Sequence, residues 1–317
     1  MQCSSRLRLI VATGCLLYGS AVAAAKPILP PPSKVSPHVY AWFGPHEGPT
    51  KANQGFRMNL AFVVGDKAVA VLETGYTEAM AKEMLAHIAK ITKLPVKYAI
   101  NSNSQPDRFF GNEVFRKQGA TIIAHEKEAA RMAQSGGDMA GGIERLLELP
   151  AGSVAPPGPP DKAITADMQI DLGGGVVLQV RHFGVGHTPA PLVVHVPTDN
   201  VVYAGDILYS GRLLAVIPGG NVKGWIDTFD ALKTFGNATF IPGHGKPAKL
   251  DAFTFPTRDY LVLLNDYMAK KVEEGMGMDD AIKGLDQSKF SKLANFDELA
   301  GRNASWVYLE REAESFK

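Results

Sequence analysis

The sequence contains almost no cysteine. Cys3 and Cys15 are the only two among its 317 residues, and both lie within the first 25 positions. The rest of the chain therefore has no disulfide, no thiolate ligand for a metal and no cysteine nucleophile. A chain of this length buries most of the surface that its unfolded form exposes, so it needs neither a disulfide nor a structural metal to fold.

An excess of charge of one sign is also lacking. The 33 Lys and Arg residues and the 32 Asp and Glu residues give a formal net charge of +1, and no basic stripe occurs along the chain. This balance argues against nucleic acid and against an anionic membrane surface as partners. We therefore expect a small molecule as the substrate or ligand.

Long hydrophobic runs are absent, and the one short run lies near the N-terminus. Two arginines precede the largely apolar residues 9–17, and small residues follow. This order is typical of a secretory signal peptide over residues 1–25, with cleavage near Ala23 to Ala25. The run is too short for a membrane span, so we expect an exported, periplasmic protein with no stable span after cleavage. An uncleaved anchor and a lipid-modified Cys15 are the weaker alternatives.

Strand-like and helix-like segments alternate twice along the rest of the chain. After a Pro-rich leader at residues 26–37, strands are followed by helices, and the same order returns in the second half. This order favours an α/β fold in which two similar halves pack sheet to sheet. No repeated motif marks a boundary, so residues 38–317 are expected to form a single domain that ends in C-terminal helices.

Helical periodicity is clearest at residues 78–91, where Met80, Met84 and Ile88 fall on one face. A shorter helix is expected from residue 126 to residue 134. Residues 135–160 then contain two Gly-Gly pairs and a Pro-rich stretch. Such a composition predicts a surface loop, which is a candidate lid over a site.

Four polar residues follow predicted strands and lie beside glycines or in a turn. They are Asp107, His187, Asp206 and His244. Loops that carry function on a rigid scaffold begin at such positions. Taken singly, each is typical of an ordinary turn residue, and only their combination indicates a functional site.

The combination resembles the metallo-β-lactamase superfamily. The resemblance is carried by Gly-His-Thr at 186–188, Ala-Gly-Asp at 204–206 and Pro-Gly-His-Gly at 242–245, and it extends from about residue 39 to 248. Glu-Thr-Gly at 73–75 resembles the family's Asp-Thr-Gly, with Glu73 in place of Asp. The closing region resembles a periplasmic branch more loosely. The resemblance implies a four-layer αβ/βα sandwich with a two-metal site at one edge of the sheets.

The family's central motif, His-x-His-x-Asp-His, is degenerate in this chain. Its positions are occupied by Asn103, Gln105, Asp107 and Arg108, so three of the four ligands are replaced and only Asp107 remains. The resemblance implies that the first metal would bind Asn103, Gln105 and His187. The second would bind Asp107, Arg108 and His244, with Asp206 as the bridge.

The substitutions change which ions the site can hold. An amide oxygen is a poor replacement for imidazole at zinc. Arg108 cannot coordinate a metal because its guanidinium stays protonated. It can instead form bidentate hydrogen bonds with Asp107 or Asp206 and offset their charge. The residues that remain for one zinc, manganese or iron ion are Asp107, His187, Asp206 and His244.

Three hypotheses follow from this set. In the first, one metal activates water for hydrolysis of an ester, lactone, amide or phosphate, with Asp107 and Arg108 as catalytic residues. In the second, the chain is a non-catalytic binding protein in which Arg108 receives an anionic ligand. In the third, a metal-free enzyme uses Arg108 to stabilise an oxyanion. Glu73 and His182 are further candidates to line the pocket, as are Tyr209 and Arg212, for which a place in a surface loop is the alternative.

Overall fold

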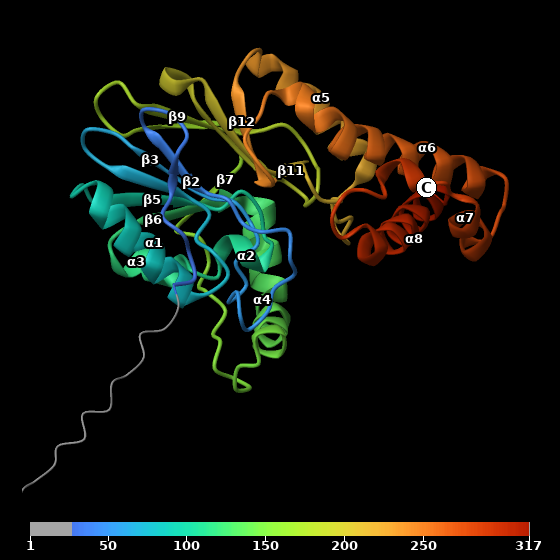
Figure 1. The fold of residues 1–317 in the computed structure, drawn as a ribbon, viewed down its shortest axis with the longest axis horizontal. Coiled ribbons are helices and arrows are strands. Elements are labelled where there is room, and N and C mark those ends of the chain that lie inside the picture. Colours follow the sequence, from blue (N-terminus) through green and yellow to red (C-terminus); the bar gives the residue numbers. More distant parts are fainter. Residues whose placement is uncertain (1–26, 317) are drawn as a thin grey trace, which may run out of the picture.

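The structure is a computed structural model that describes residues 27–316. Two sheets lie face to face, and helices cover the outer side of each (Figure 1). The predicted αβ/βα sandwich is confirmed. The predicted signal peptide over residues 1–25 lies outside the described residues. Between residues 27 and 316, no helix combines the length and the apolar character needed to cross a membrane.

The first sheet has seven strands in chain order. The first four run antiparallel to their neighbours, and the remaining pairs are parallel. Its side chains alternate between two apolar layers: Phe62 and Val71 pack under helices, whereas Ala61 and Val63 face the second sheet. The strands are β1 (Ser33–Lys34), β2 (Val39–Trp42), β3 (Leu60–Val64), β4 (Val69–Leu72), β5 (Val96–Ile100), β6 (Thr121–His125) and β7 (Lys162–Ile164).

The second sheet has five strands in the order β12-β11-β10-β9-β8. Only β11 and β12 pair in parallel. Leu178, Val180 and Val194 join the layer between the two sheets, and Val202 and Phe240 face the outer helices. The strands are β8 (Met168–Asp171), β9 (Val177–His182), β10 (Leu192–Val196), β11 (Val201–Tyr209) and β12 (Thr239–His244).

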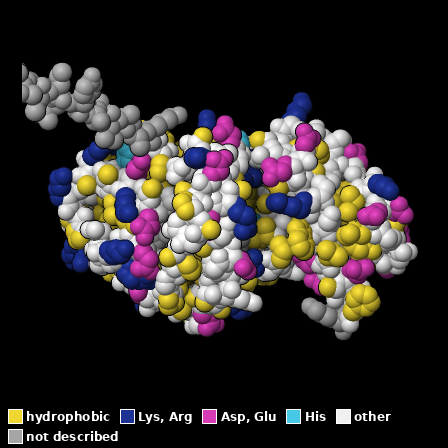
Figure 2. Space-filling view, turned by 90° about the horizontal axis from the view of Figure 1, so that it is seen from below, with side chains coloured by type: hydrophobic (Ala, Val, Ile, Leu, Met, Phe, Trp, Pro, Cys, Tyr) yellow, Lys and Arg dark blue, Asp and Glu magenta, His cyan; other side chains and the backbone are white. Residues whose placement is uncertain are grey.

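Helices form the two outer layers. Those before residue 150 cover the first sheet, and those after residue 220 pack against the second sheet and then project to one side of it (Figure 1). The space-filling view shows Lys, Arg, Asp and Glu interspersed over one face, in keeping with the balanced charge (Figure 2). The helices are α1 (Glu78–Ile91), α2 (Pro106–Phe109), α3 (Asn112–Lys117), α4 (Glu126–Leu147), α5 (Val222–Ala231), α6 (Tyr260–Glu273), α7 (Met278–Gly284) and α8 (Phe296–Ser315).

Helix α4 corrects the prediction of a loop from residue 135. The helix continues to Leu147 through both Gly-Gly pairs. Met132, Gly136 and Ala140 continue a buried stripe that ends at Leu147. Burial of this stripe against the first sheet outweighs the helix-breaking cost of each glycine, about 1 kcal/mol. The irregular part of the expected lid is therefore limited to residues 148–161.

The Pro-rich leader is attached to the body of the protein. The carboxylate of Glu83 on α1 accepts hydrogen bonds from the backbone N–H groups of Ile28 and Leu29. Leu29 is 2% exposed and belongs to the apolar layer under the first sheet. β1 then pairs with β2. The segment from residue 27 thus contributes to the stability of the fold.

Leu29→Ala tests this contribution. We expect it to lower the free energy of unfolding by about 2–3 kcal/mol, because a buried leucine leaves a cavity when truncated. Leu309→Ala, at a position 41% exposed on α8, is the matched control and is expected to cost less than about 1 kcal/mol. Urea denaturation of both variants measures the difference, and equal losses would show that the leader does not stabilise the fold.

Candidate functional site

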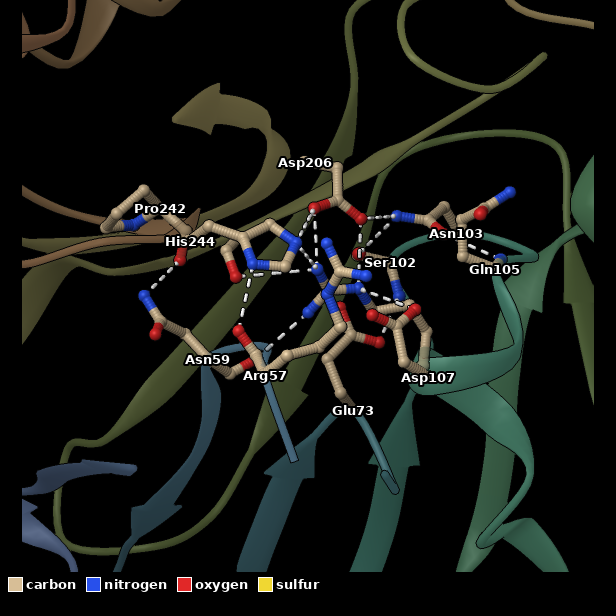
Figure 3. A network of polar contacts seen from close by, with 12 residues as sticks. Arg57, Asn59, Glu73, Ser102, Asn103, Gln105, Asp107, Asp206, Pro242 and His244 are labelled. Atoms are coloured by element: carbon tan, nitrogen blue, oxygen red, sulfur yellow. Dashed lines mark hydrogen bonds and ion pairs between the residues drawn. The ribbon is translucent and has the colours of Figure 1, made fainter. Parts of the chain in front are cut away.

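The four motif residues meet at one edge of the sandwich. Asp107 lies on α2, His187 follows β9, Asp206 lies within β11 and His244 ends β12. All four line one cleft of about 340 Å³. Figure 3 shows Asp107, Asp206 and His244 directed toward a common centre. The tertiary structure therefore brings together the residues that the sequence singled out.

The centre of this cluster is the guanidinium of Arg108. Its Nε donates to Asp206 Oδ2 at 2.9 Å and its Nη2 to Asp206 Oδ1 at 2.5 Å. Its Nη1 donates to the backbone oxygen of Asn59 at 3.1 Å. Arg108 is fully buried. The predicted bidentate contact is thus made with Asp206, while Asp107 lies 3.7 Å away from Nε.

The backbone holds Arg108 in this position. Its carbonyl oxygen accepts hydrogen bonds from the Thr74 N–H and from the side-chain amide of Asn101, both at 2.9 Å. On the other side, Gly205 has a left-handed φ of +52° at an irregularity in the pairing of β11 with β12. This bulge redirects the strand just before Asp206. Both ends of the ion pair are therefore fixed before any ligand binds.

The two amide substitutions take part in the same network. Asn103 donates its Nδ2 to Asp206 Oδ2 at 2.8 Å, and its Oδ1 accepts the N–H of Gln105 at 2.8 Å. Asn103 therefore faces the bridging carboxylate as a hydrogen-bond donor. The side chain of Gln105 lines the cleft. Asn103 has become a partner of Asp206, as Figure 3 shows.

The histidines at the site are buried and neutral. Burial lowers the pKa of His244 well below its usual value, and it also lowers the pKa of His187. His244 Nδ1 lies 3.0 Å from the backbone oxygen of Arg57, so Nδ1 carries the proton. Its Nε2 is then the acceptor that faces Arg108 Nη2 at 3.4 Å. The Nδ1 of His187 is buried and has no hydrogen-bond partner.

The donor set at this site does not fit a metal ion. Both oxygens of Asp206 are engaged by the guanidinium of Arg108, and Asn103 presents its NH2 group to the same carboxylate. Within residues 27–316, no group of three His, Cys, Asp or Glu side chains is arranged to hold a metal. A fixed positive charge therefore lies where the family would place its bridged metals, and it offsets the carboxylate charge. Burial alone would raise the pKa of Asp206, but Arg108 holds it well below its usual range.

Glu73 lies beneath the site and does not line the cleft. It is fully buried, and its Oε2 accepts the backbone N–H of Ser102 at 3.0 Å. Its Oε1 has no hydrogen-bond partner. Burial raises the pKa of Glu73 to about 8, although Arg108 opposes the shift. Glu73 therefore carries a proton at neutral pH.

Sequence reasoning missed two side chains that position the site. Glu128 on α4 is fully buried and accepts hydrogen bonds from the Ser104 N–H at 2.9 Å and from the Ala190 N–H at 2.7 Å. It thereby joins the loop that carries Asn103 to the loop that follows His187. Asn59 donates its Nδ2 to two backbone oxygens of the Pro-Gly-His-Gly turn. No motif surrounds either residue, so only their contacts show these roles.

Of the further residues predicted to line the pocket, Tyr209 lies in the cleft and His182 does not. Tyr209 lines the cleft, and its ring stacks on that of His244 with centroids 5.0 Å apart. His182 does not line it, which corrects its candidacy. Its ring lies against His125 at 4.5 Å, and its Nδ1 is 3.3 Å from a backbone oxygen. Strand β9 directs His182 toward the start of α4 because side chains alternate along a strand.

Positive charge faces the cleft from residues other than Arg108. Arg57, Arg212 and Arg302 line it, and Arg108 does not. All donor nitrogens of Arg108 are used by protein acceptors. The hypothesis that Arg108 receives an anionic ligand is therefore corrected. Arg212 was a sequence candidate, whereas Arg57 precedes β3 without any motif that could have identified it.

Comparison with known proteins identifies the family of this chain. A sequence profile of the metallo-beta-lactamase superfamily matches residues 55–244. The chain therefore belongs to the metallo-β-lactamase superfamily. The match ends at His244, so it spans the four motif residues Asp107, His187, Asp206 and His244.

Individual relatives are distant. The chain is 31% identical to a metallo-beta-lactamase type 2 from Bacteroides fragilis over 90 residues, which cover 27% of this chain and 36% of the relative. It is 19% identical over 254 residues to a linear primary-alkylsulfatase from a Pseudomonas species, with 68% of this chain and 48% of the relative covered. The chain thus spans less than half of the length of the curated relatives it matches.

Solved structures show the fold alone. A metallo-beta-lactamase from Pontibacter korlensis superposes with a TM-score of 0.60 at 20% identity, covering 73% of this chain and 98% of the other. The structure of TMB-1 gives a TM-score of 0.58 at 16% identity, covering 75% of this chain and 98% of the other. About a quarter of this chain lies outside these superpositions.

Arg108→Met tests the buried ion pair. It leaves Asp206 buried without a counter-charge, so we expect the free energy of unfolding to fall by about 3–5 kcal/mol. The double variant Arg108→Met/Asp206→Asn removes both charges and is expected to recover at least half of the loss. Urea denaturation in the presence of a chelator measures both values. A double variant no more stable than the single one would contradict the assignment.

Glu73→Gln tests the protonated carboxyl group. The folded pKa of about 8 lies well above the ordinary value of a glutamate, so the unfolded chain loses this proton first as pH rises. The free energy of unfolding should therefore fall by about 1.4 kcal/mol per pH unit within this window. Because glutamine does not titrate, the stability of the variant relative to the wild type should rise as pH increases from 5 to 8. Parallel melting-temperature profiles for the two proteins would refute the raised pKa.

Proposed function

We propose that this chain is a metal-independent ligand-binding protein of the metallo-β-lactamase superfamily, exported by its N-terminal segment. The observation that supports this proposal best is the buried contact of Arg108 with both oxygens of Asp206. The guanidinium carries a permanent charge, offers no exchangeable coordination position and cannot activate water as a metal does. The ligand is a small molecule held in the cleft beside Tyr209 and His187.

The one-metal hydrolase is the competing function. There, Asp107, His187, Asp206 and His244 would bind zinc, manganese or iron, and the metal would activate water for an ester, lactone, amide or phosphate. This arrangement requires Arg108 to release Asp206 and move away. Membership of the superfamily supports it, because relatives that match this chain are named as hydrolytic enzymes. The contacts of Arg108 argue against it.

The metal-free enzyme is disfavoured by the same contacts. An oxyanion hole requires donors that are directed at the reacting atom. Arg108 is fully buried, and each of its nitrogens donates to a protein acceptor. It also does not line the cleft, so its donors are not directed at a substrate there.

Metal content decides between these functions. We expect the mature protein, purified without chelator, to contain less than about 0.1 equivalent of zinc, manganese or iron by elemental mass spectrometry. Arg108→His supplies the imidazole that the family motif has at this position. Together with Asp107, Asp206 and His244 it completes a ligand set for one zinc ion, so this variant is expected to gain close to one equivalent.

The control for this measurement is Arg116→His, which adds a histidine on α3 outside the cleft and is expected to gain no metal. If the wild type carries about one equivalent of metal and loses it in His244→Ala, the one-metal hydrolase is the correct function. An ester, lactone and phosphodiester screen would then follow. If Arg108→His gains no zinc, the assigned geometry of the carboxylates and histidine is wrong.

A further inference from the structure

We infer that the cleft binds a small organic anion, with the oxyanion headgroup between the guanidinium groups of Arg57 and Arg212. The inference rests on the proposed function, since a cleft without a metal has to hold its ligand by protein groups alone. It assigns the headgroup to two arginines that lie outside the family motif. It also assigns a class of ligand, namely a carboxylate, sulfate or phosphate that carries a short apolar tail.

Arg212 is a buried cation without a counter-ion. It is 2% exposed and lines the cleft. Its Nη1 is buried and has no hydrogen-bond partner, and its Nε donates to the Leu213 backbone oxygen at 3.3 Å. It forms no ion pair with any carboxylate in the described chain. A buried charge in this state is unfavourable, and an anion in the cleft would offset the cost.

Arg57 brings a second positive charge to the same cleft. It is half-buried, and its Nε is buried without a hydrogen-bond partner. Its backbone oxygen is tied to His244 Nδ1 at 3.0 Å, which fixes the position of the residue. Burial and the charge of Arg57 lower the pKa of Arg212 to about 10, so Arg212 stays cationic at neutral pH. Two planar guanidinium groups suit the oxygens of one anion.

Several other arginines of this chain differ from Arg57 and Arg212 because they are paired with carboxylates. Arg116, Arg181, Arg258 and Arg311 each form an ion pair with a carboxylate of the protein. The cleft does contain carboxylates, because Asp107 and Glu298 line it. Neither forms an ion pair with Arg57 or Arg212 among the contacts of residues 27–316. The two arginines are therefore left available to an anion that enters the cleft.

The remainder of the cleft indicates the rest of the ligand. Leu146, Ile217 and Leu299 line the same space as the two arginines. The volume of about 340 Å³ lies near the lower end of small-molecule pockets. A short alkyl or aryl group attached to the oxyanion would bury apolar surface there. A purely inorganic anion would leave this part of the cleft without contacts.

A series of six-carbon probes tests the ligand class. Hexanoate, hexyl sulfate and hexyl phosphate carry the three oxyanions, whereas 1-hexanol and hexylammonium carry the same tail without negative charge. Isothermal titration calorimetry on the full mature protein is expected to show binding of at least one anion at least tenfold tighter than 1-hexanol. The anion that binds most tightly identifies the headgroup. Equal affinity for hexanol and all three anions would overturn the inference.

Variants locate the anion. Arg212→Met and Arg57→Met are each expected to weaken binding of the preferred anion at least tenfold. Arg145→Met makes the same change of charge at an exposed position on α4 and is expected to leave the affinity within twofold. Arg212→Met should also keep or raise the melting temperature of the free protein, because it removes an uncompensated buried charge. A purely structural arginine would show the opposite change.

Binding within threefold of the wild type in both Met variants would overturn the assignment. If Arg212→Met does not fold, the half-buried Arg57→Met alone decides. Metal content measured on the same samples keeps the two proposals separate. Metal in the wild type, lost with chelator, would refute the metal-independent function, whereas the anion site fails only if binding does not depend on Arg57 or Arg212.

Discussion

The contact between Arg108 and Asp206 is the interaction on which the site depends. It joins helix α2 of the first half to strand β11 of the second, so it links the two sheets at the edge where the motif residues gather. Desolvation of both charges is costly, and the bidentate geometry with additional backbone acceptors offsets that cost. Asn59, Asn103 and His244 are then arranged around the pair as donors and acceptors.

A guanidinium in place of metal changes what this architecture can do. A metal exchanges ligands and lowers the pKa of bound water, whereas a buried arginine does neither. What remains is a cleft lined by neutral histidines, by a tyrosine stacked on His244, and by Arg57 and Arg212, which form no ion pair among the described residues. Such a lining suits the binding of an anion by protein groups alone. The family scaffold is thus kept while the chemistry at its centre is altered.

Much of the fold follows from local patterns in the chain. The helix at residues 78–91 has the predicted bounds because its apolar period, its Thr77 cap and its end at Thr92 agree. Residues 106–117 form two helices and not one, because the chain turns at Gly111, where a Cβ would meet the Thr74 backbone oxygen at 2.1 Å. The prediction of a loop at the glycine-rich stretch of α4 was wrong because composition reports only the intrinsic helix-breaking cost of glycine. The burial of this helix against the sheet, which outweighs that cost, depends on residues far away in the sequence.

The sequence by itself determined the superfamily, because three short motifs resemble those of the family, and through that resemblance it predicted the sandwich and the meeting of Asp107, Asp206 and His244. It also established that Arg108 cannot be a ligand, which follows from its pKa alone. Only the tertiary structure decided that Arg108 pairs with Asp206 and that Arg57 faces the cleft with Arg212. Those facts depend on which distant side chains share a desolvated space, and no local pattern in the chain encodes that.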